Sequence, residues 1–205
     1  MNTHHQYLYL DSFPVDPGAR AIIIGTIHPH ERDEFVMDFF YGSRCSIWTI
    51  LAEAFPGKLQ DPTLLIAVRQ FLARYNITMS YTIRSCQRLT NTALDAHLMP
   101  PVYNTSLVEQ IKNSSIEQVF FTSGASKNCA LRTFYTGVLK YKYLPTIVAK
   151  SKMGHLPVDI FGRKIGYTVL YSPATTADRG IKKSKRYKDA LLLYRTTTGP
   201  PMPIK

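Results

Sequence analysis

The sequence predicts an α/β fold, namely a three-layer α/β/α sandwich around a mostly parallel central sheet of about four strands. Short apolar runs rich in β-branched and aromatic residues alternate with longer stretches of helical periodicity. Connections of that length join parallel strands through crossover helices, which cover both faces of the sheet. The first apolar run, Ala-Ile-Ile-Ile-Gly at 21–25, has no polar face and is typical of a central parallel strand.

The next elements follow from local patterns. Apolar side chains recur at helical spacing over 46–55, and Pro56-Gly57 ends that helix. Asp61 is a suitable N-cap with Pro62 in the first helical position, which predicts a second helix from there to Tyr75. Strands are expected at 77–83 and 119–122.

The carboxyl-terminal half continues the alternation. We expect a helix over 127–141, strands at 147–149 and 167–171, a hairpin at 161–164, and a closing helix over 184–194. One domain is expected over 1–195, followed by a loose Pro-rich tail at 196–205. Because ligands bind at the carboxyl ends of parallel strands, the residues after Gly25 are placed near the expected site.

The composition is that of an intracellular globular protein. Of the 205 residues 45% are hydrophobic, enough for one well-filled core. Cys45, Cys86 and Cys129 are far apart and form no CxxC pair, which argues against a disulfide framework and a structural zinc site. There is no long apolar run and no export-signal pattern, so we expect a cytoplasmic protein without a membrane partner.

The charge points to an anionic partner. The net charge is +11, and nucleic acid is the commonest partner of such a protein, although a diffuse excess of cations is equally often a solvated surface. The cations between Asp178 and Asp189 form a local positive patch without an acidic residue among them: Arg179, Lys182, Lys183, Lys185, Arg186 and Lys188.

Several residues carry candidate chemistry. His28, His30, Glu31 and Asp33 form the loop HPHERD, which is similar to the HxHxDH pattern of dinuclear metal hydrolases, except that the Asp falls one residue late and the next His is missing. As loop residues they need no special role, or one of them touches a phosphate or a base. Cys45 is a candidate nucleophile, with an inert packed thiol as the alternative.

Aromatic and turn residues suggest contacts with DNA. Phe39, Phe40, Tyr41 and Trp48 offer a stacking face for an extruded base, and the alternative is that they are core residues. Trp48, at helical spacing with Leu51 and Phe55, is expected in the core in either case. A rigid Ser172-Pro173 turn beside the positive patch is suited to insertion into a DNA groove, and its alternative is an ordinary strand-to-helix turn.

Five segments, in order, carry a more specific signal: GTIHPH at 25–30, FFYGSRCSIW at 39–48, SCQRLTNTALD at 85–95, VFFTSGASKN at 119–128 and YSPATTA at 171–177. Together they resemble the motifs of the uracil-DNA glycosylase superfamily, closest to its hypoxanthine-DNA glycosylase and mismatch-specific uracil/thymine-DNA glycosylase branches. The resemblance covers most of the chain.

The resemblance implies a DNA glycosylase of base excision repair. Such an enzyme acts as a monomer on double-stranded DNA, flips a damaged base into a pocket and hydrolyses its N-glycosidic bond with water, without metal or cofactor. The implied pocket consists of Gly25, Thr26, Ile27, Phe40, Tyr41 and Ser123. The implied DNA contacts are Ser172, Pro173, Ala174, Thr175, Arg179, Lys182, Lys183, Lys185 and Arg186. The nearby groups able to activate water are His28, His30, Asp33 and Asp38. Cys45, at the position that matches the catalytic Asn of the hypoxanthine branch, is a further catalytic candidate.

The chain differs from the family pattern at its usual catalytic and reading positions. Ile27, Cys45, Tyr81 and Ser123 stand where members carry Asp or Asn. Loss of a positioned general base costs about 10²- to 10⁴-fold in rate. A second hypothesis is therefore a catalytically silent DNA-binding member, and a third is a metal-dependent hydrolase that uses His28 and His30.

Overall fold

The computed structural model of the protein describes residues 9–28, 35–88, 97–124, 126–142, 153–174 and 182–198. Its main sheet has the order β2-β1-β5-β7-β6. The strands are β1 (Ala21–Gly25), β2 (Ile77–Tyr81), β5 (Gln118–Phe121), β6 (Met153–His155) and β7 (Gly166–Val169). The first three and β7 are parallel to one another, and β6 is an antiparallel edge strand. The predicted α/β class with a mostly parallel sheet is confirmed.

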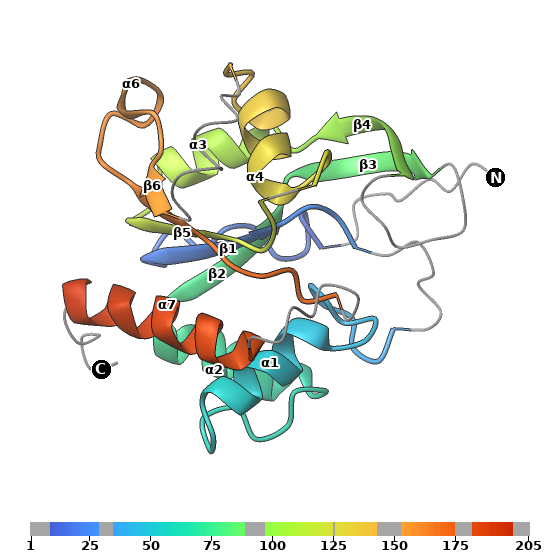
Figure 1. Ribbon diagram of the computed structural model, residues 1–205, viewed down its shortest axis with the longest axis vertical. Helices are drawn as coiled ribbons and strands as arrows, with labels where there is room; N and C mark the ends of the chain where they lie inside the picture. Colours follow the sequence, from blue (N-terminus) through green and yellow to red (C-terminus); the bar gives the residue numbers. More distant parts are fainter. Residues whose placement is uncertain are drawn as a thin grey trace.

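Helices cover both faces of this sheet (Figure 1). One layer holds α1 (Ser46–Ala54), α2 (Leu65–Tyr75) and α7 (Lys183–Thr198), and the other holds α3 (Ser106–Lys112), α4 (Ala130–Thr133) and the π-helical turn η2 (Phe134–Val138). A short helix, α6 (Val158–Phe161), lies between β6 and β7 in sequence. Two further strands, β3 (Ile83–Arg88) and β4 (Leu98–Tyr103), form a separate antiparallel pair. None of the helices in the described ranges is long and apolar enough to cross a membrane.

Strand β1 is the centre of the core. Its side chains alternate between two apolar clusters: Ile23 packs with α1, α2 and α7, while Ile22 and Ile24 pack with α3 and α4. All three isoleucines have no exposed surface. Burial on both faces explains why this strand has no polar side of its own. Trp48 is also in the core, as expected from its helical spacing.

Several boundaries differ from the sequence-based expectations. Helix α2 begins three residues after Pro62, because the Asp61 carboxylate accepts hydrogen bonds from the nitrogen and hydroxyl of Thr63 and closes a separate turn. The helix expected over 127–141 consists of α4 and η2, and a short helix occupies the start of the expected hairpin. Helix α7 continues into the expected tail as far as Thr198. The expected strand at 147–149 lies outside the described residues.

Arg163 joins α3 to the segment before β7. Its guanidinium donates four hydrogen bonds of 2.8–3.1 Å to the carbonyls of Ile111, Lys112, Ser114 and Ile116. The last carbonyls of a helix have no partner within the helix, so a cation at this end satisfies them and complements the helix dipole. This contact fixes α3 against the amino-terminal edge of the sheet.

Arg163→Met is therefore expected to lower the free energy of unfolding by about 2 kcal/mol, because hydrogen bonds to a charged donor are lost from a partly buried site. The matched control is Lys164→Met at the exposed neighbouring residue, which should change stability by less than about 0.5 kcal/mol. Urea denaturation of the three proteins measures both effects. Equal midpoints for the two variants would contradict this role.

Candidate functional site

The carboxyl ends of the parallel strands lie level with one another. Gly25 pairs with Tyr81, and Ile24 pairs with Phe121. The pairing continues one residue further, because Thr122 N donates to Ile24 O at 3.0 Å. Gly124, after β5, lies against Val169 of β7 so closely that a Cβ would come within 2.6 Å of its Cγ1. The loops after β1, β2, β5 and β7 therefore leave from the same end of the sheet, where the parallel strands have their carboxyl ends. We call this end the sheet edge.

Tyr41 lies across this edge. Its hydroxyl forms a 2.8 Å hydrogen bond with Thr122 Oγ1, and its ring packs edge to face on Tyr81. A Cβ at Gly25 would overlap the Tyr41 hydroxyl and would lie 2.8 Å from the Tyr81 ring. Only glycine leaves room for both rings over the end of β1. Tyr41 remains half-buried, so part of it faces solvent.

The backbone of Tyr41 has the left-handed conformation, with φ at 58°. This conformation is uncommon for a bulky residue and needs support from its surroundings. The support is a 2.9 Å hydrogen bond from Tyr41 N to Tyr81 Oη. Burial raises the pKa of Tyr81 well above its ordinary value, so its hydroxyl stays neutral at any physiological pH.

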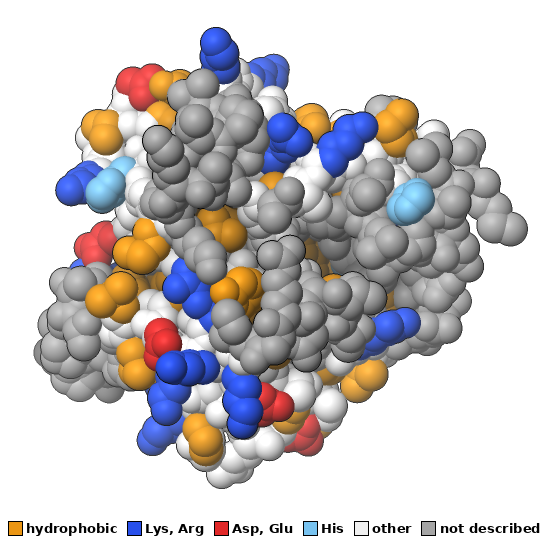
Figure 2. Space-filling view, viewed as in Figure 1, with side chains coloured by type: hydrophobic (Ala, Val, Ile, Leu, Met, Phe, Trp, Pro, Cys, Tyr) orange, Lys and Arg blue, Asp and Glu red, His pale blue; other side chains and the backbone are white. Residues whose placement is uncertain are grey.

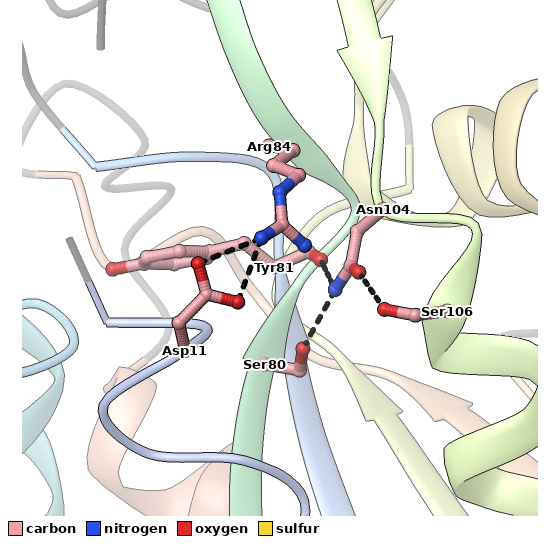
Figure 3. Close-up of polar contacts among 6 residues, drawn as sticks. All are labelled: Asp11, Ser80, Tyr81, Arg84, Asn104 and Ser106. Atoms are coloured by element: carbon pink, nitrogen blue, oxygen red, sulfur yellow. Dashed lines mark hydrogen bonds and ion pairs between the residues drawn. The ribbon is translucent and has the colours of Figure 1, made fainter. Parts of the chain in front are cut away.

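The side chain of Asn104 holds the backbone of Tyr81 in place (Figure 3). Asn104 Nδ2 donates to Tyr81 O at 3.0 Å and to Ser80 Oγ at 3.3 Å, and Asn104 Oδ1 accepts from Ser106 at the start of α3. Asn104 is buried, with 2% of its surface exposed. The network joins the end of β2 to α3 and fixes the position from which the Tyr81 ring supports Tyr41.

An ion pair ties the described amino-terminal segment to β3. Arg84 Nη2 lies 2.6 and 2.7 Å from the two oxygens of Asp11 (Figure 3). The Asp11 side chain is more than half exposed, so solvent weakens this pair, and its main effect is on geometry.

The predicted pocket residues after β1 are largely enclosed. Thr26 is buried, and its carbonyl accepts from Ile83 N at 3.0 Å, which starts β3. Ile27 is half-buried and packs on the small apolar cluster of Ile83, Cys86 and Leu98. These two residues connect the main sheet to the β3–β4 pair, and their backbone lies beside Gly25.

His28 lies in an aromatic enclosure. Its ring centroid is 5.8 Å from that of Tyr9, 5.9 Å from Phe35 and 6.3 Å from Tyr81, and 4% of its surface is exposed. Its carbonyl accepts a 3.0 Å hydrogen bond from the buried Arg88 guanidinium. His30 and Asp33, the other two candidates of this loop, lie outside the described residues.

Phe40 and Cys45 lie inside the core. Phe40 is 1% exposed and packs on Tyr9, Phe39 and Tyr81, so neither face of its ring is open to a base. Cys45 is 3% exposed, and its Sγ donates weakly to Gly42 O at 3.7 Å. Burial raises the pKa of the Cys45 thiol, which leaves it protonated and poorly nucleophilic at neutral pH. Of the two adjacent aromatic candidates, Tyr41 is the one at the sheet edge.

Ser123 supports the start of α4. Its Oγ accepts a 2.9 Å hydrogen bond from Ala130 N, and its carbonyl accepts from Leu131 N. The hydroxyl therefore satisfies one of the free donors at the amino end of the helix. Ser123 remains half-buried at the end of β5, next to Thr122.

The segment after β7 and the positive patch lie together at the start of α7. Ser172 is half-buried, Pro173 is buried and Ala174 is exposed. Lys182 and Lys185 are exposed, as is Lys188, whereas Lys183 and Arg186 donate hydrogen bonds to backbone carbonyls of the protein itself. Thr175 and Arg179 lie outside the described residues. Figure 2 shows Lys and Arg side chains over α7 and the neighbouring helices.

Sequence reasoning missed two residues of this site. Thr122 directly follows the apolar run of β5, and that position alone was a usable signal. Tyr187 of α7 donates a hydrogen bond to Tyr171 O, which no sequence pattern indicates.

Comparisons with known proteins add no assignment. No protein-family model matches the chain, and no curated protein matches it. In the described ranges, no group of three or more His, Cys, Asp or Glu side chains is arranged to hold a metal ion.

Gly25→Ala tests the close approach of the two tyrosines. The added methyl group must displace Tyr41 or Tyr81, so the free energy of unfolding should fall by about 1 to 3 kcal/mol, as for other overpacked sites. Gly18→Ala is the control, because a Cβ there meets its nearest atom at an ordinary 3.4 Å. Thermal or urea denaturation compares the two. A Gly25→Ala protein as stable as Gly18→Ala would contradict the arrangement.

Proposed function

We propose that the protein is a DNA glycosylase of the uracil-DNA glycosylase type, which extrudes a damaged base from double-stranded DNA and hydrolyses its N-glycosidic bond with water. One observation carries the proposal. Four of the five segments that resemble the superfamily lie at one sheet edge: three of them leave β1, β5 and β7, and the fourth carries Tyr41, with exposed lysines at the start of α7. A glycosylase requires this convergence of a base site and a cationic surface.

Tyr41 supplies the recognition group in this proposal, and Thr122 orients it. The Tyr41 ring is supported from beneath by Tyr81 and by the bare Cα of Gly25, so it is a firm surface for base stacking. Thr122 is buried and its hydroxyl donates to Ile24 O at 3.4 Å, so it accepts in its bond with Tyr41. The Tyr41 hydroxyl is then suited to accept from an N–H group on the edge of a base, which deaminated purines and pyrimidines both carry.

Water activation is assigned to the loop that begins at His28. This loop follows β1 directly and carries His30 and Asp33 in the sequence. The His28 ring is enclosed by three aromatic rings. In this proposal His28 therefore fixes the start of the loop and does not itself contact the water. A well-placed general base contributes about 10²- to 10⁴-fold to such a reaction.

The direct test is excision in single turnover. Excess protein is incubated with duplexes that carry uracil, hypoxanthine, xanthine, or thymine opposite guanine, and abasic sites are then cleaved with alkali. We expect cleavage of at least one deaminated base and none of the undamaged duplex. Absence of cleavage across the whole set would contradict the enzyme.

Cys45→Asn is the matched variant for this assay. Asn tolerates the left-handed backbone at this position, where φ is 47°, and restores the residue type of the motif that the segment resembles. Because the side chain at 45 is enclosed in the core, we expect Cys45→Asn to leave the excision rate within about twofold of the parent and to lower the free energy of unfolding by about 1 to 3 kcal/mol, the cost of burying a polar group. Cys45→Ser is the control, and faster excision by Cys45→Asn alone would contradict this placement.

A catalytically silent DNA-binding protein is the second candidate. The observation that favours it is that Cys45 and Ser123 both have structural partners, Gly42 O and Ala130 N, where the superfamily pattern has reacting or reading groups. Both candidates bind duplex DNA through the same cations, so the excision assay separates them.

The salt dependence of DNA binding tests the exposed cations. Each phosphate contact contributes about −0.9 to the slope of log K against log salt concentration, so Lys185→Gln should make the slope shallower by about 0.9. Lys164→Gln is the control, because Lys164 is exposed just before β7, at the opposite edge of the sheet. Fluorescence anisotropy at several salt concentrations measures the slopes. Equal slopes for both variants would contradict a phosphate contact at Lys185.

A further inference from the structure

Lys182 and the first two turns of α7 carry two sets of side chains. Lys182, Lys185 and Lys188 are exposed. Lys183 and Tyr187 instead donate hydrogen bonds to carbonyls of the segment that follows β7, and Arg186 donates one to the carbonyl of Val169, the last residue of that strand. The positive patch that the sequence shows is thus divided by the fold into an outward set and an inward set.

The inward set holds the end of β7 at one point and the segment after it at two. Arg186 Nη2 donates to Val169 O at 3.2 Å, Tyr187 Oη to Tyr171 O at 2.8 Å, and Lys183 Nζ to Ala174 O at 2.6 Å. Leu170 N still donates to Phe121 O of the sheet at 2.8 Å. Beyond Leu170, α7 supplies the hydrogen bonds to Tyr171 O and Ala174 O.

Tyr187 also lies next to the site at the sheet edge. It has no exposed surface and belongs to the apolar cluster between α7 and the sheet. Tyr41 packs against this same apolar cluster. Tyr187 therefore contacts the segment after β7 through its hydroxyl and shares its apolar surroundings with Tyr41. Burial raises the pKa of Tyr187 well above its ordinary value, so the hydroxyl stays protonated and remains a donor.

We propose that Tyr187 is a positioning residue that couples the DNA contacts of α7 to the base site, with Lys183 and Arg186 as anchors of the segment at 170–174 rather than phosphate ligands. The proposal rests on the proposed function. Phosphates held by the outward lysines fix the helix, and the three inward bonds transmit that position to Ser172 and Ala174. The turn that would enter the DNA groove is thereby kept at a set distance from Tyr41.

The test compares Tyr187→Phe with Tyr167→Phe. Tyr167 is also a buried tyrosine, but it belongs to the apolar cluster on the opposite face of the sheet. Amide hydrogen exchange is measured at 170–174 with and without an undamaged duplex, and excision is measured in single turnover.

We expect Tyr187→Phe to exchange about 3- to 10-fold faster at 170–174, the effect of one lost hydrogen bond, and to excise more slowly by a similar factor. Its DNA affinity and salt slope should stay within about twofold of the parent, because no phosphate contact is removed. Duplex DNA should slow exchange at 170–174 in the parent and in Tyr167→Phe, and much less in Tyr187→Phe.

Exchange and excision separate the two proposals. If the parent excises no base but exchange follows this pattern, the coupling stands and the glycosylase proposal fails. If Tyr187→Phe matches Tyr167→Phe in exchange, the coupling is overturned whatever the excision rate. Lys183→Gln supplies a second variant outside the core: it should speed exchange at Ala174 without changing the salt slope, and a shallower slope would make Lys183 a phosphate ligand.

Discussion

The parallel pairing of β1 with β2 and β5 is the constraint on which the rest of the structure depends. Strand β1 is buried on both faces, and a slip of one residue would move each isoleucine from one apolar cluster to the other. The register is therefore fixed, and with it the level at which Gly25, Tyr81 and Thr122 reach the edge. The contacts that hold Tyr41 come from these three positions.

Tyr41 has a strained backbone at the same edge. A left-handed backbone at a residue such as Tyr41 costs about 1 to 3 kcal/mol and persists only where its surroundings enforce it. Here the Tyr81 hydroxyl, the Thr122 hydroxyl and the bare Cα of Gly25 enforce it together. The buried Asn104 network holds Tyr81 in turn, so rigidity is transferred from the core to a half-exposed aromatic ring. Such a ring is preorganised for stacking, since it has little freedom left to lose on binding.

Much of the fold could be predicted from the sequence, because apolar periodicity reports burial directly. The run at β1 and the helical spacing of α1 are examples, and the common edge of the loops follows from parallel strands. What escaped prediction depends on tertiary contacts. Phe40 and Tyr41 are adjacent aromatics, and only the backbone turn at Tyr41 sends one into the core and the other to the edge. Lys183 and Lys185 are both lysines of the same cationic run, so the sequence does not distinguish them. Only the fold does, because Lys183 donates a hydrogen bond to Ala174 O.

The most direct measurement is a crystal structure of the protein with a duplex that contains a deaminated base opposite a mismatched partner. The account predicts an extruded nucleotide at the carboxyl edge of the sheet, stacked on Tyr41, with Ser172 and Ala174 in the groove and Lys182, Lys185 and Lys188 on phosphates. A duplex bound elsewhere on the surface, with all its bases stacked and this edge empty, would contradict it.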